Sequence, residues 1–328
     1  MRRGHRPVLA GRTRPAIEAL ASELGLDRRV FDLADRAAVE AGLEGMTAVL
    51  HCAGPFARTA GPMNAGCLRA RAHYLDVTGE VEVFETLAAL HRDAQDAGVM
   101  LLPGVGFDVV PSDCLAAHLK RRLPSATRLA LALRTGGGLS RGTAITVVEN
   151  LHRGGLVRRN GVLRRVPAGW KTRHVDFGRG PRAVVSIPWG DVSTAFHSTG
   201  IPDVEVYLAA PLPLRIGLKL VGPFGPLLAS RPVQRFLRRR IEDRGPGPTR
   251  EERAHGRSHL WGEAADDHGA RVVSRLEGPE GYTLTALTAV AAMEKVLAGS
   301  APVGFQTPSR AYGADFVLQI DGVRREDL

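Results

Sequence analysis

The sequence VMLLPGVGFDVVPSD at residues 99–113 joins a strand, a glycine-containing loop and the start of a helix. The apolar run at 99–103 is typical of a buried strand, and Ser112 or Asp113 is expected to cap the helix that follows. A strand connected to a helix through a short glycine loop is the repeating unit of a parallel α/β sheet. The loop places Asp108 at the carboxyl end of the strand, where such sheets bind their ligands.

The same unit recurs along the first third of the chain. Before the stretch at 99–113, apolar runs that favour strands lie at 7–10, 29–33, 47–52 and 73–77. Each run is followed by a segment with apolar residues at helical spacing, and Pro62 suits the first turn of the third of these helices. The alternation predicts a Rossmann-like doubly wound parallel sheet over residues 1–120.

A second α/β domain, for substrate binding or dimerisation, is predicted for residues 121–281. Its expected elements are a strand at 127–134, a glycine loop at 136–142, a helix at 143–153, strand-like pieces at 182–190, 191–200 and 204–210, and a hairpin that turns at 267–269. A helix at 282–299 and a strand at 314–320 predict that residues 282–328 return to the first domain. The glycine loop lacks the lysine of a phosphate-binding loop, so we interpret it as a bend whose following helix is open to an anionic substrate group.

Composition and charge exclude several classes of protein. The 328-residue chain has a formal net charge of +10, carried almost wholly by arginine, and three cysteines without metal-site spacing. We therefore expect neither a disulfide framework nor a structural metal site. No signal peptide or apolar run of membrane-spanning length is visible, which favours a cytoplasmic location. The most basic stretch, 231–257, contains acidic residues and a single aromatic residue, so we expect no nucleic-acid partner.

An apolar segment at 207–228 has several interpretations. Arg215, Lys219 and four prolines interrupt it, so it cannot form an unbroken membrane-spanning helix. Buried packing, the lining of an apolar pocket, a homodimer face and a shallow peripheral contact with a membrane all remain open for this segment.

Small or polar residues end several predicted strands, which predicts one shared cleft at that edge of the sheet. After the second strand of a dinucleotide-binding sheet, an acidic residue selects NAD, whereas an arginine pairs with the additional phosphate of NADP. Arg12 occupies this position, so NADP(H) is the expected cofactor. Asp32 and Thr78 have an alternative role as caps of the helices that follow them. The candidate cofactor-binding residues are Gly11, Arg12, Asp32, Leu33, Cys52, Ala53, Gly54, Pro55, Thr78 and Gly79.

Hydride transfer between a nicotinamide and a double bond also requires a group that exchanges a proton. Asp108 and Glu80, both at strand ends, are the candidate catalytic residues, and each has an alternative role as a helix cap or loop organiser. The expected reaction is NADP-dependent hydride transfer to or from a C=C, C=O or C=N bond of a small-molecule or acyl substrate.

Five stretches carry a resemblance to a known family: HRPVLAGR (5–12), VLHCAGPFARTAGPM (49–63), HYLDVTGE (73–80), LLPGVGFDVVPSDCLA (101–116) and STGIPDVEVY (198–207). They resemble the saccharopine dehydrogenase-like oxidoreductases, in particular the branch of the trans-acting enoyl reductases. The resemblance implies an NADP-binding Rossmann domain with an inserted second α/β domain, and a substrate related to lipids.

Members of this family place a further strand and a GxxGxxG-type turn ahead of the stretch at 5–12. That strand lies in the middle of the sheet, so without it the strands at 7–10 and 47–52 lose their common neighbour. We expect this strand and loop to lie outside the chain, either because translation starts upstream or because the protein is degenerate. The 328-residue chain is accordingly expected to bind NADPH weakly or not at all. A catalytically inactive scaffold or membrane-peripheral partner is the alternative function.

Overall fold

The computed structural model describes residues 4–135, 144–145, 148, 153–218, 228, 230–243 and 247–328. The strands in this part are β1 (Leu9–Gly11), β2 (Arg28–Val30), β3 (Ala48–His51), β4 (His73–Asp76), β5 (Met100–Leu102), β6 (Arg128–Thr135), β7 (Gly155–Arg159), β8 (Val162–Val166), β9 (Thr172–Asp176), β10 (Pro181–Ser186), β11 (Asp203–Ala209), β12 (Arg257–Ala265), β13 (Arg271–Pro279), β14 (Gly304–Phe305) and β15 (Arg324–Asp327). The helices are α1 (Arg14–Leu24), α2 (Arg36–Leu43), α3 (Phe56–Ala70), α4 (Val81–Ala89), α5 (His91–Ala97), α6 (Val110–Arg122), α8 (Asp191–Thr199), α10 (Arg231–Glu242), α11 (Arg250–His255), α12 (Gly281–Leu297), α13 (Pro308–Tyr312) and the 3-10 helix η2 (Phe316–Gln319).

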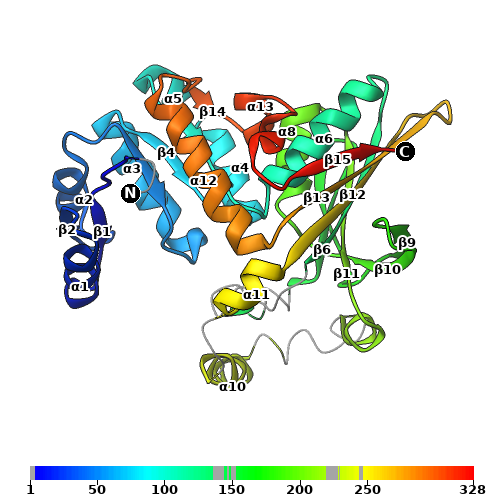
Figure 1. The fold of residues 1–328 in the computed structure, drawn as a ribbon, viewed down its shortest axis with the longest axis horizontal. Coiled ribbons are helices and arrows are strands. Elements are labelled where there is room, and N and C mark those ends of the chain that lie inside the picture. The colour runs from blue at the N-terminus through cyan, green and yellow to red at the C-terminus, as the bar shows by residue number, and fades with distance from the viewer. Residues whose placement is uncertain are drawn as a thin grey trace.

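Three sheets organise the described residues (Figure 1). The two-stranded sheet β1-β2 and the four-stranded sheet β14-β5-β4-β3 are entirely parallel. The nine-stranded sheet is mixed and has the order β15-β13-β12-β6-β11-β10-β9, with β7 beside β11 and β8 beside β7. The predicted α/β class with parallel sheets is confirmed. The segment that follows α12 contributes to two sheets, because β14 pairs with β5 and β15 pairs with β13.

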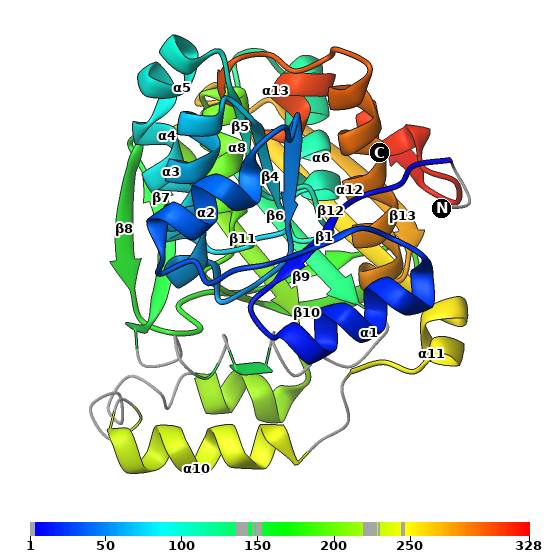
Figure 2. The ribbon, with the colours of Figure 1, turned by 90° about the vertical axis from the view of Figure 1, so that its left-hand side faces the viewer.

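Helices cover both faces of the four-stranded sheet (Figure 2). On one face, Val39 of α2, Met63 of α3 and Leu87 of α4 pack with Tyr74 of β4 in one buried cluster. On the other face, Leu75 of β4 belongs to a second cluster that includes residues of α12. The alternation of Tyr74 and Leu75 between the two faces follows from the two-residue period of a strand.

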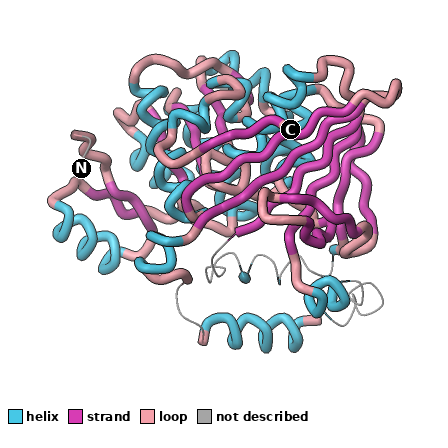
Figure 3. The backbone as a smooth tube through the Cα atoms, turned by 45° about the vertical axis from the view of Figure 1, so that its right-hand side comes forward, coloured by secondary structure: helices cyan, strands magenta, loops and turns pink. Residues whose placement is uncertain are grey.

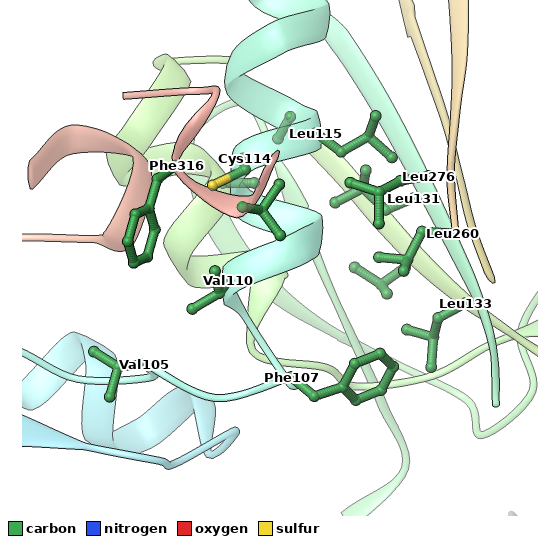
Figure 4. Packing of buried hydrophobic residues seen from close by; sticks show 14 of the residues in the cluster. Val105, Phe107, Val110, Cys114, Leu115, Leu131, Leu133, Leu260, Leu276 and Phe316 are labelled. Atoms are coloured by element: carbon green, nitrogen blue, oxygen red, sulfur yellow. The ribbon is translucent and has the colours of Figure 1, made fainter. Parts of the chain in front are cut away.

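This second cluster also reaches into the nine-stranded sheet. Leu115 of α6 lies beside Leu131, Leu260 and Leu276 of β6, β12 and β13 (Figure 4). Because α6 directly follows the loop after β5, this shared core holds the carboxyl edge of the small sheet against the large one. Burial of such leucines stabilises the arrangement by about 2 kcal/mol for each side chain.

The β1-β2 sheet lies apart from the other strands (Figure 3). Its register runs from Leu9 opposite Arg28 to Gly11 opposite Val30. Within the described residues, β3 pairs with β4, and no ladder joins β1 to β3. The parallel strands predicted for residues 1–120 are therefore divided between two separate sheets.

The predicted strand-like piece at 191–200 is wrong, because these residues form α8, which ends at Gly200 with a φ of +70°. Its valine and threonines favour strands when considered locally. Val192 and Ala195 are nevertheless buried in the core that also contains α6, and this packing overrides the local preference.

The predicted strand at 314–320 is also wrong, since its centre is the 3-10 helix η2. Phe316 is buried within the core, and the Leu318 amide donates to the Asp315 carbonyl at 3.1 Å, which closes a tight turn instead of a ladder. The last strand is β15, whose charged sequence RRED occupies the edge of the large sheet. Charged residues are common on edge strands, because they discourage pairing with other chains.

Other predictions can be compared directly with the structure. The hairpin predicted to turn at 267–269 is formed by β12 and β13. A second hairpin, β7-β8, turns at Asn160 and Gly161, which have φ of +49° and +75°. The helix predicted to start at Pro62 begins earlier, at Phe56. The glycine loop at 136–142 and most of the predicted helix at 143–153 lie outside the described residues.

An ion pair between a buried arginine and a half-buried glutamate connects α4 to the second part of the molecule. Arg158 of β7, whose side chain is 4% exposed, donates to Glu85 Oε1 at 2.5 Å, and Ser193 Oγ of α8 donates to the same oxygen at 2.5 Å. Burial acts to raise the pKa of Glu85, but the nearby His197, the hydrogen bond from Ser193 and the charge of Arg158 outweigh it and lower the pKa to about 2. The His197 Nε2 atom lies 3.6 Å from Glu85 Oε1, beyond hydrogen-bond distance.

Replacement Glu85→Ala is expected to lower the free energy of unfolding by about 2–3 kcal/mol, because it leaves Arg158 buried without a carboxylate. The folded-state pKa of about 2 lies below the ordinary 4.5 of glutamate. The stabilisation is therefore present above about pH 4.5 and is lost as the pH falls toward 2. Urea denaturation at neutral and acidic pH measures both effects. Glu82→Ala, on the exposed side of the same helix, is the matched control, and equal losses for the two variants would contradict the prediction.

Candidate cofactor and active site

The carboxyl ends of β4 and β5 are tied together by the buried side chain of Asp76. Its Oδ1 accepts hydrogen bonds from the Thr78 amide at 2.9 Å and the Gly104 amide at 2.8 Å. Its Oδ2 accepts from the Tyr74 hydroxyl at 2.7 Å. Burial raises the pKa of Asp76 to about 6, although these hydrogen bonds favour the charged form. The contact fixes the two loops that carry the predicted catalytic residues.

The loop after β5 is held from two further sides. The Phe107 amide donates to Thr285 Oγ1 of α12 at 3.0 Å. The Thr288 hydroxyl of the same helix donates to the Val105 carbonyl at 2.7 Å. Trp189, which precedes α8, donates its indole N–H to the Asp108 carbonyl at 2.8 Å. The backbone of Asp108 is therefore held where the small sheet, α12 and the second part of the chain meet.

The Asp108 carboxyl group lies against Gly79. A Cβ atom on Gly79 would come within 2.8 Å of Asp108 Oδ2, so a larger residue at position 79 would displace this carboxylate. Burial raises the pKa of Asp108 to about 6. The described residues donate no hydrogen bond to this carboxylate, and the residue keeps partial exposure to solvent. A half-buried carboxyl group with this pKa can hold a proton near neutral pH and release it to a neighbouring molecule.

Two further acidic side chains lie behind Asp108. Burial raises the pKa of Asp191 well above its ordinary value, and the nearby charges of Asp113 and Asp108 add to the rise. Asp191 Oδ2 has no hydrogen-bond partner among the described residues. Asp113 accepts from the Ser198 hydroxyl and, at 2.7 Å, from the Ser309 amide, and burial raises its pKa. Sequence patterns did not single out Asp191, because only the fold brings it to Asp108.

Asp113 and Ser112 do not cap α6, as the sequence predicted. The helix begins at Val110, so both residues lie in its first turn, and its N-cap position is Val109. The Ser112 hydroxyl donates to the Val109 carbonyl at 3.0 Å, and Asp113 contacts other elements instead of the amides of its own helix.

Glu80, the other predicted catalytic residue, caps α3. Its Oε1 accepts from the Phe56 amide at 2.9 Å and its Oε2 from the Ala57 amide at 2.9 Å. Both carboxylate oxygens thus satisfy backbone donors at a helix N-terminus, where a negative charge is favoured. The alternative role as a helix cap is what the geometry supports for Glu80. Its own amide donates to the buried Thr78 hydroxyl at 3.0 Å, so Thr78 organises the same turn.

The end of β3 exposes its backbone. Cys52, Ala53 and Gly54 are exposed, and the Gly54–Pro55 peptide bond is cis. The Thr59 hydroxyl donates to the Ala53 carbonyl at 2.6 Å, which holds the turn before α3. An exposed turn of small residues leaves room for the close approach of a sugar, and the cofactor-binding role of these positions stays a prediction.

The ends of β1 and β2 carry the remaining predicted cofactor-binding residues. Arg12 is exposed, and no hydrogen bond or ion pair engages its guanidinium within the described residues. A Cβ atom on Gly11 would lie 2.7 Å from Ile17 Cδ1, so this glycine allows α1 to pack on the strand. Leu33 is half-buried and packs against the cluster formed by α2, α3 and α4 on the small sheet.

The sequence suggested a helix cap at Asp32, but Asp35 has that role. Asp32 is exposed, and its Oδ1 accepts from the Ala34 amide at 2.9 Å, which forms a turn. The helix cap is Asp35, whose carboxylate accepts from the Ala38 amide at 3.1 Å. An aspartate directly before an amphipathic segment was the available signal for this cap.

Two grooves on the described part of the chain lie away from the strand ends that carry the predicted site residues. One of about 550 Å³ lies beside β1 and β2 and is lined by Val8, Arg14, Glu18, Asp27, Arg28, Arg29 and Val30. Another, of about 320 Å³, lies between α12 and the segment after η2. In the described part of the chain, no three His, Cys, Asp or Glu side chains are grouped as metal ligands.

The predicted cofactor fits part of this arrangement. An unengaged guanidinium at Arg12 suits the additional phosphate of NADP(H), and the exposed turn at 52–54 suits a ribose. The N-terminus of α3 does not suit the pyrophosphate, because Glu80 already satisfies its first amides with a negative charge.

The chain is similar in sequence to known proteins. Residues 2–102 match the family model of the saccharopine dehydrogenase NADP binding domain. The chain is 32% identical over 123 residues to a trans-acting enoyl reductase of Mycobacterium ulcerans. The aligned residues cover 36% of this chain and 29% of the relative. It is 29% identical over 105 residues to a saccharopine dehydrogenase-like oxidoreductase of Homo sapiens. Here the aligned residues cover 32% of this chain and 24% of the relative. The aligned part thus spans less than a third of each of these two relatives.

The whole fold also has a counterpart among solved structures. Saccharopine dehydrogenase (L-Glu forming) from Saccharomyces cerevisiae superposes with a TM-score of 0.66 at 12% sequence identity, covering 98% of this chain and 94% of that chain. The resemblance and the NADP cofactor class predicted from the sequence are confirmed. Over residues 2–102 the chain therefore carries the sequence pattern of the saccharopine dehydrogenase NADP binding domain family, and as a whole it has the saccharopine dehydrogenase fold.

Proposed function

We propose that this protein is an NADP-dependent oxidoreductase that transfers a hydride between the nicotinamide and a C=C, C=O or C=N bond, with Asp108 as the group that exchanges the proton. The observation that carries the proposal is the Asp108 carboxyl group, which lies at the carboxyl edge of the small sheet against Gly79 and has a pKa raised to about 6. The names of the enoyl reductase relatives support a C=C bond of an acyl substrate, and thus a substrate related to lipids.

The residues of the chain have distinct tasks in this proposal. When bound, NADPH supplies a hydride to one carbon of the double bond and becomes NADP⁺. The adjacent atom of the substrate takes the proton that Asp108 releases, and Asp108 regains a proton from water. Trp189 and α12 hold the backbone of Asp108 in place. Burial raises the pKa of Asp191 behind it, which disfavours a second negative charge beside the ionised Asp108.

Transfer of an isotope from the cofactor tests the reaction class directly. The purified chain is incubated with NADPH carrying deuterium at the nicotinamide C4, together with enoyl thioester, ketone or imine acceptors. We expect mass spectrometry to find one deuterium on a carbon of one acceptor class. Absence of deuterium from every acceptor, with folding verified by circular dichroism, would contradict the proposal.

The role of Asp108 predicts a specific pH profile. The carboxyl group is protonated below its pKa of about 6, so kcat for reduction should be constant there and should fall as the pH rises above it. Asp108→Asn should lower kcat about a hundredfold or more and remove this dependence. Asp96→Asn, an exposed substitution on α5, is the control and should preserve both the rate and the profile. An unchanged profile in Asp108→Asn would exclude Asp108 as the proton donor.

The affinity for NADPH tests two expectations, namely that the separation of β1 from β3 weakens cofactor binding and that Arg12 contacts the additional phosphate. No ladder within the described residues fixes β1 to β3, so we expect NADPH to bind weakly, with a Kd above the low-micromolar range. NADPH should still bind about tenfold more tightly than NADH, and Arg12→Ala should remove this preference. Fluorescence titration measures the Kd of NADPH and of NADH for the wild-type chain and for Arg12→Ala. The control is Arg92→Ala, an exposed substitution on α5.

Each outcome of this titration has a definite meaning. Low-micromolar affinity would contradict the expected weakness, and a preference that survives Arg12→Ala would remove Arg12 from the phosphate site. Complete absence of binding together with absence of deuterium transfer would favour the alternative of a non-catalytic scaffold, which the separation of β1 from β3 supports.

A further inference from the structure

Two helical elements form a layer at one end of the molecule, below the sheets (Figures 2 and 3). One is α10, and the other comprises the helical residues 212–218. We call them the basic apolar layer, after the two kinds of side chain that they expose.

Large apolar side chains are unusually exposed in this layer. Leu212, Leu214, Ile216 and Phe236 are 58%, 46%, 50% and 58% exposed. Residues two positions apart point to different sides of a helix, so the exposure of Leu212, Leu214 and Ile216 shows that their helix stands clear of the body on several sides. Several large apolar side chains left exposed in one region are typical of a contact with another molecule or a membrane.

The contacts of α10 show which of its sides faces outward. Gln234 donates its side-chain amide to the Leu228 carbonyl at 2.7 Å and to the Val148 carbonyl at 3.1 Å. Ile241 is buried. Phe236 follows Gln234 by two residues, which is about 200° around a helix, so it points away from these contacts.

Arginines surround this outward side. The sequence of α10, RPVQRFLRRRIE, contains five arginines and one glutamate. Arg235 and Arg239 are exposed, and the guanidinium carbon of Arg240 lies 5.6 Å from the centre of the Phe236 ring. An amphipathic helix with arginines beside an exposed aromatic ring is typical of helices that lie in the plane of a membrane interface.

We propose that the basic apolar layer binds the surface of anionic phospholipid membranes. The arginines match the negative head groups, and the exposed leucines and phenylalanine enter the boundary of the acyl chains. A nucleic acid would match the arginines alone, since its phosphates offer nothing to the aliphatic side chains of residues 212–216. None of the helices in the described part of the chain has the length and hydropathy to cross a bilayer.

Vesicle sedimentation tests this proposal with the full chain. Vesicles of phosphatidylcholine mixed with phosphatidylglycerol should bind the protein, and vesicles of phosphatidylcholine alone should bind it much less. Added salt should weaken the binding, because it screens the arginines. The double variant Arg235→Gln with Arg239→Gln should lower partitioning about fivefold for each arginine removed. Phe236→Ser should also lower it, through loss of apolar burial and without any change of charge.

A matched control separates this layer from the net charge of the protein. Arg164→Gln with Arg182→Gln removes two exposed arginines from β8 and β10, and it should leave partitioning unchanged. Equal losses for the two double variants would overturn the proposal, as would failure of the wild-type chain to bind the anionic vesicles. Binding to duplex DNA that depends on Arg235 and Arg239, without binding to vesicles, would assign the layer to nucleic acid and overturn it as well.

Discussion

The buried carboxylate of Asp76 is the contact on which the candidate site depends. It receives the Thr78 and Gly104 amides and the Tyr74 hydroxyl, so the ends of β4 and β5 converge on one acidic group. Hydrogen bonds to a charged group contribute about 1.5–3 kcal/mol each, and loss of the acceptor would leave buried donors without partners. The loops that carry Gly79 and Asp108 owe their relative position to this group.

Burial then determines how the acidic residues around α6 and α8 differ in chemistry. It raises the pKa of Asp108, Asp113 and Asp191, because a negative charge is poorly solvated inside the protein. Asp113 and Asp191 are fully buried, whereas Asp108 keeps partial exposure. Only a group that combines a raised pKa with access to a ligand can exchange a proton with it. Exposure, and not residue type, distinguishes Asp108 from its two neighbours.

Local sequence patterns predicted elements well where neighbouring residues decide the structure. The apolar runs became β1 to β5, and the Asn160–Gly161 turn of β7-β8 has the Asn-Gly sequence that is typical of a two-residue hairpin. The start of α3 was misplaced for a different reason. Its first amides are capped by Glu80, which lies 24 residues beyond Phe56 in the chain. Core packing likewise turned the β-branched stretch at 191–200 into α8.

The sequence by itself determined the α/β class, the NADP-binding pattern of the first third and the place of Asp108 after a strand. These depend on hydrophobic period and on residues adjacent in the chain. Tertiary structure alone decided that Glu80 caps a helix, that Asp108 meets Gly79 without a hydrogen-bond donor from the described residues, and that Phe236 faces outward. The physical reason is that hydrogen bonding, desolvation and exposure are set by groups that only folding brings together.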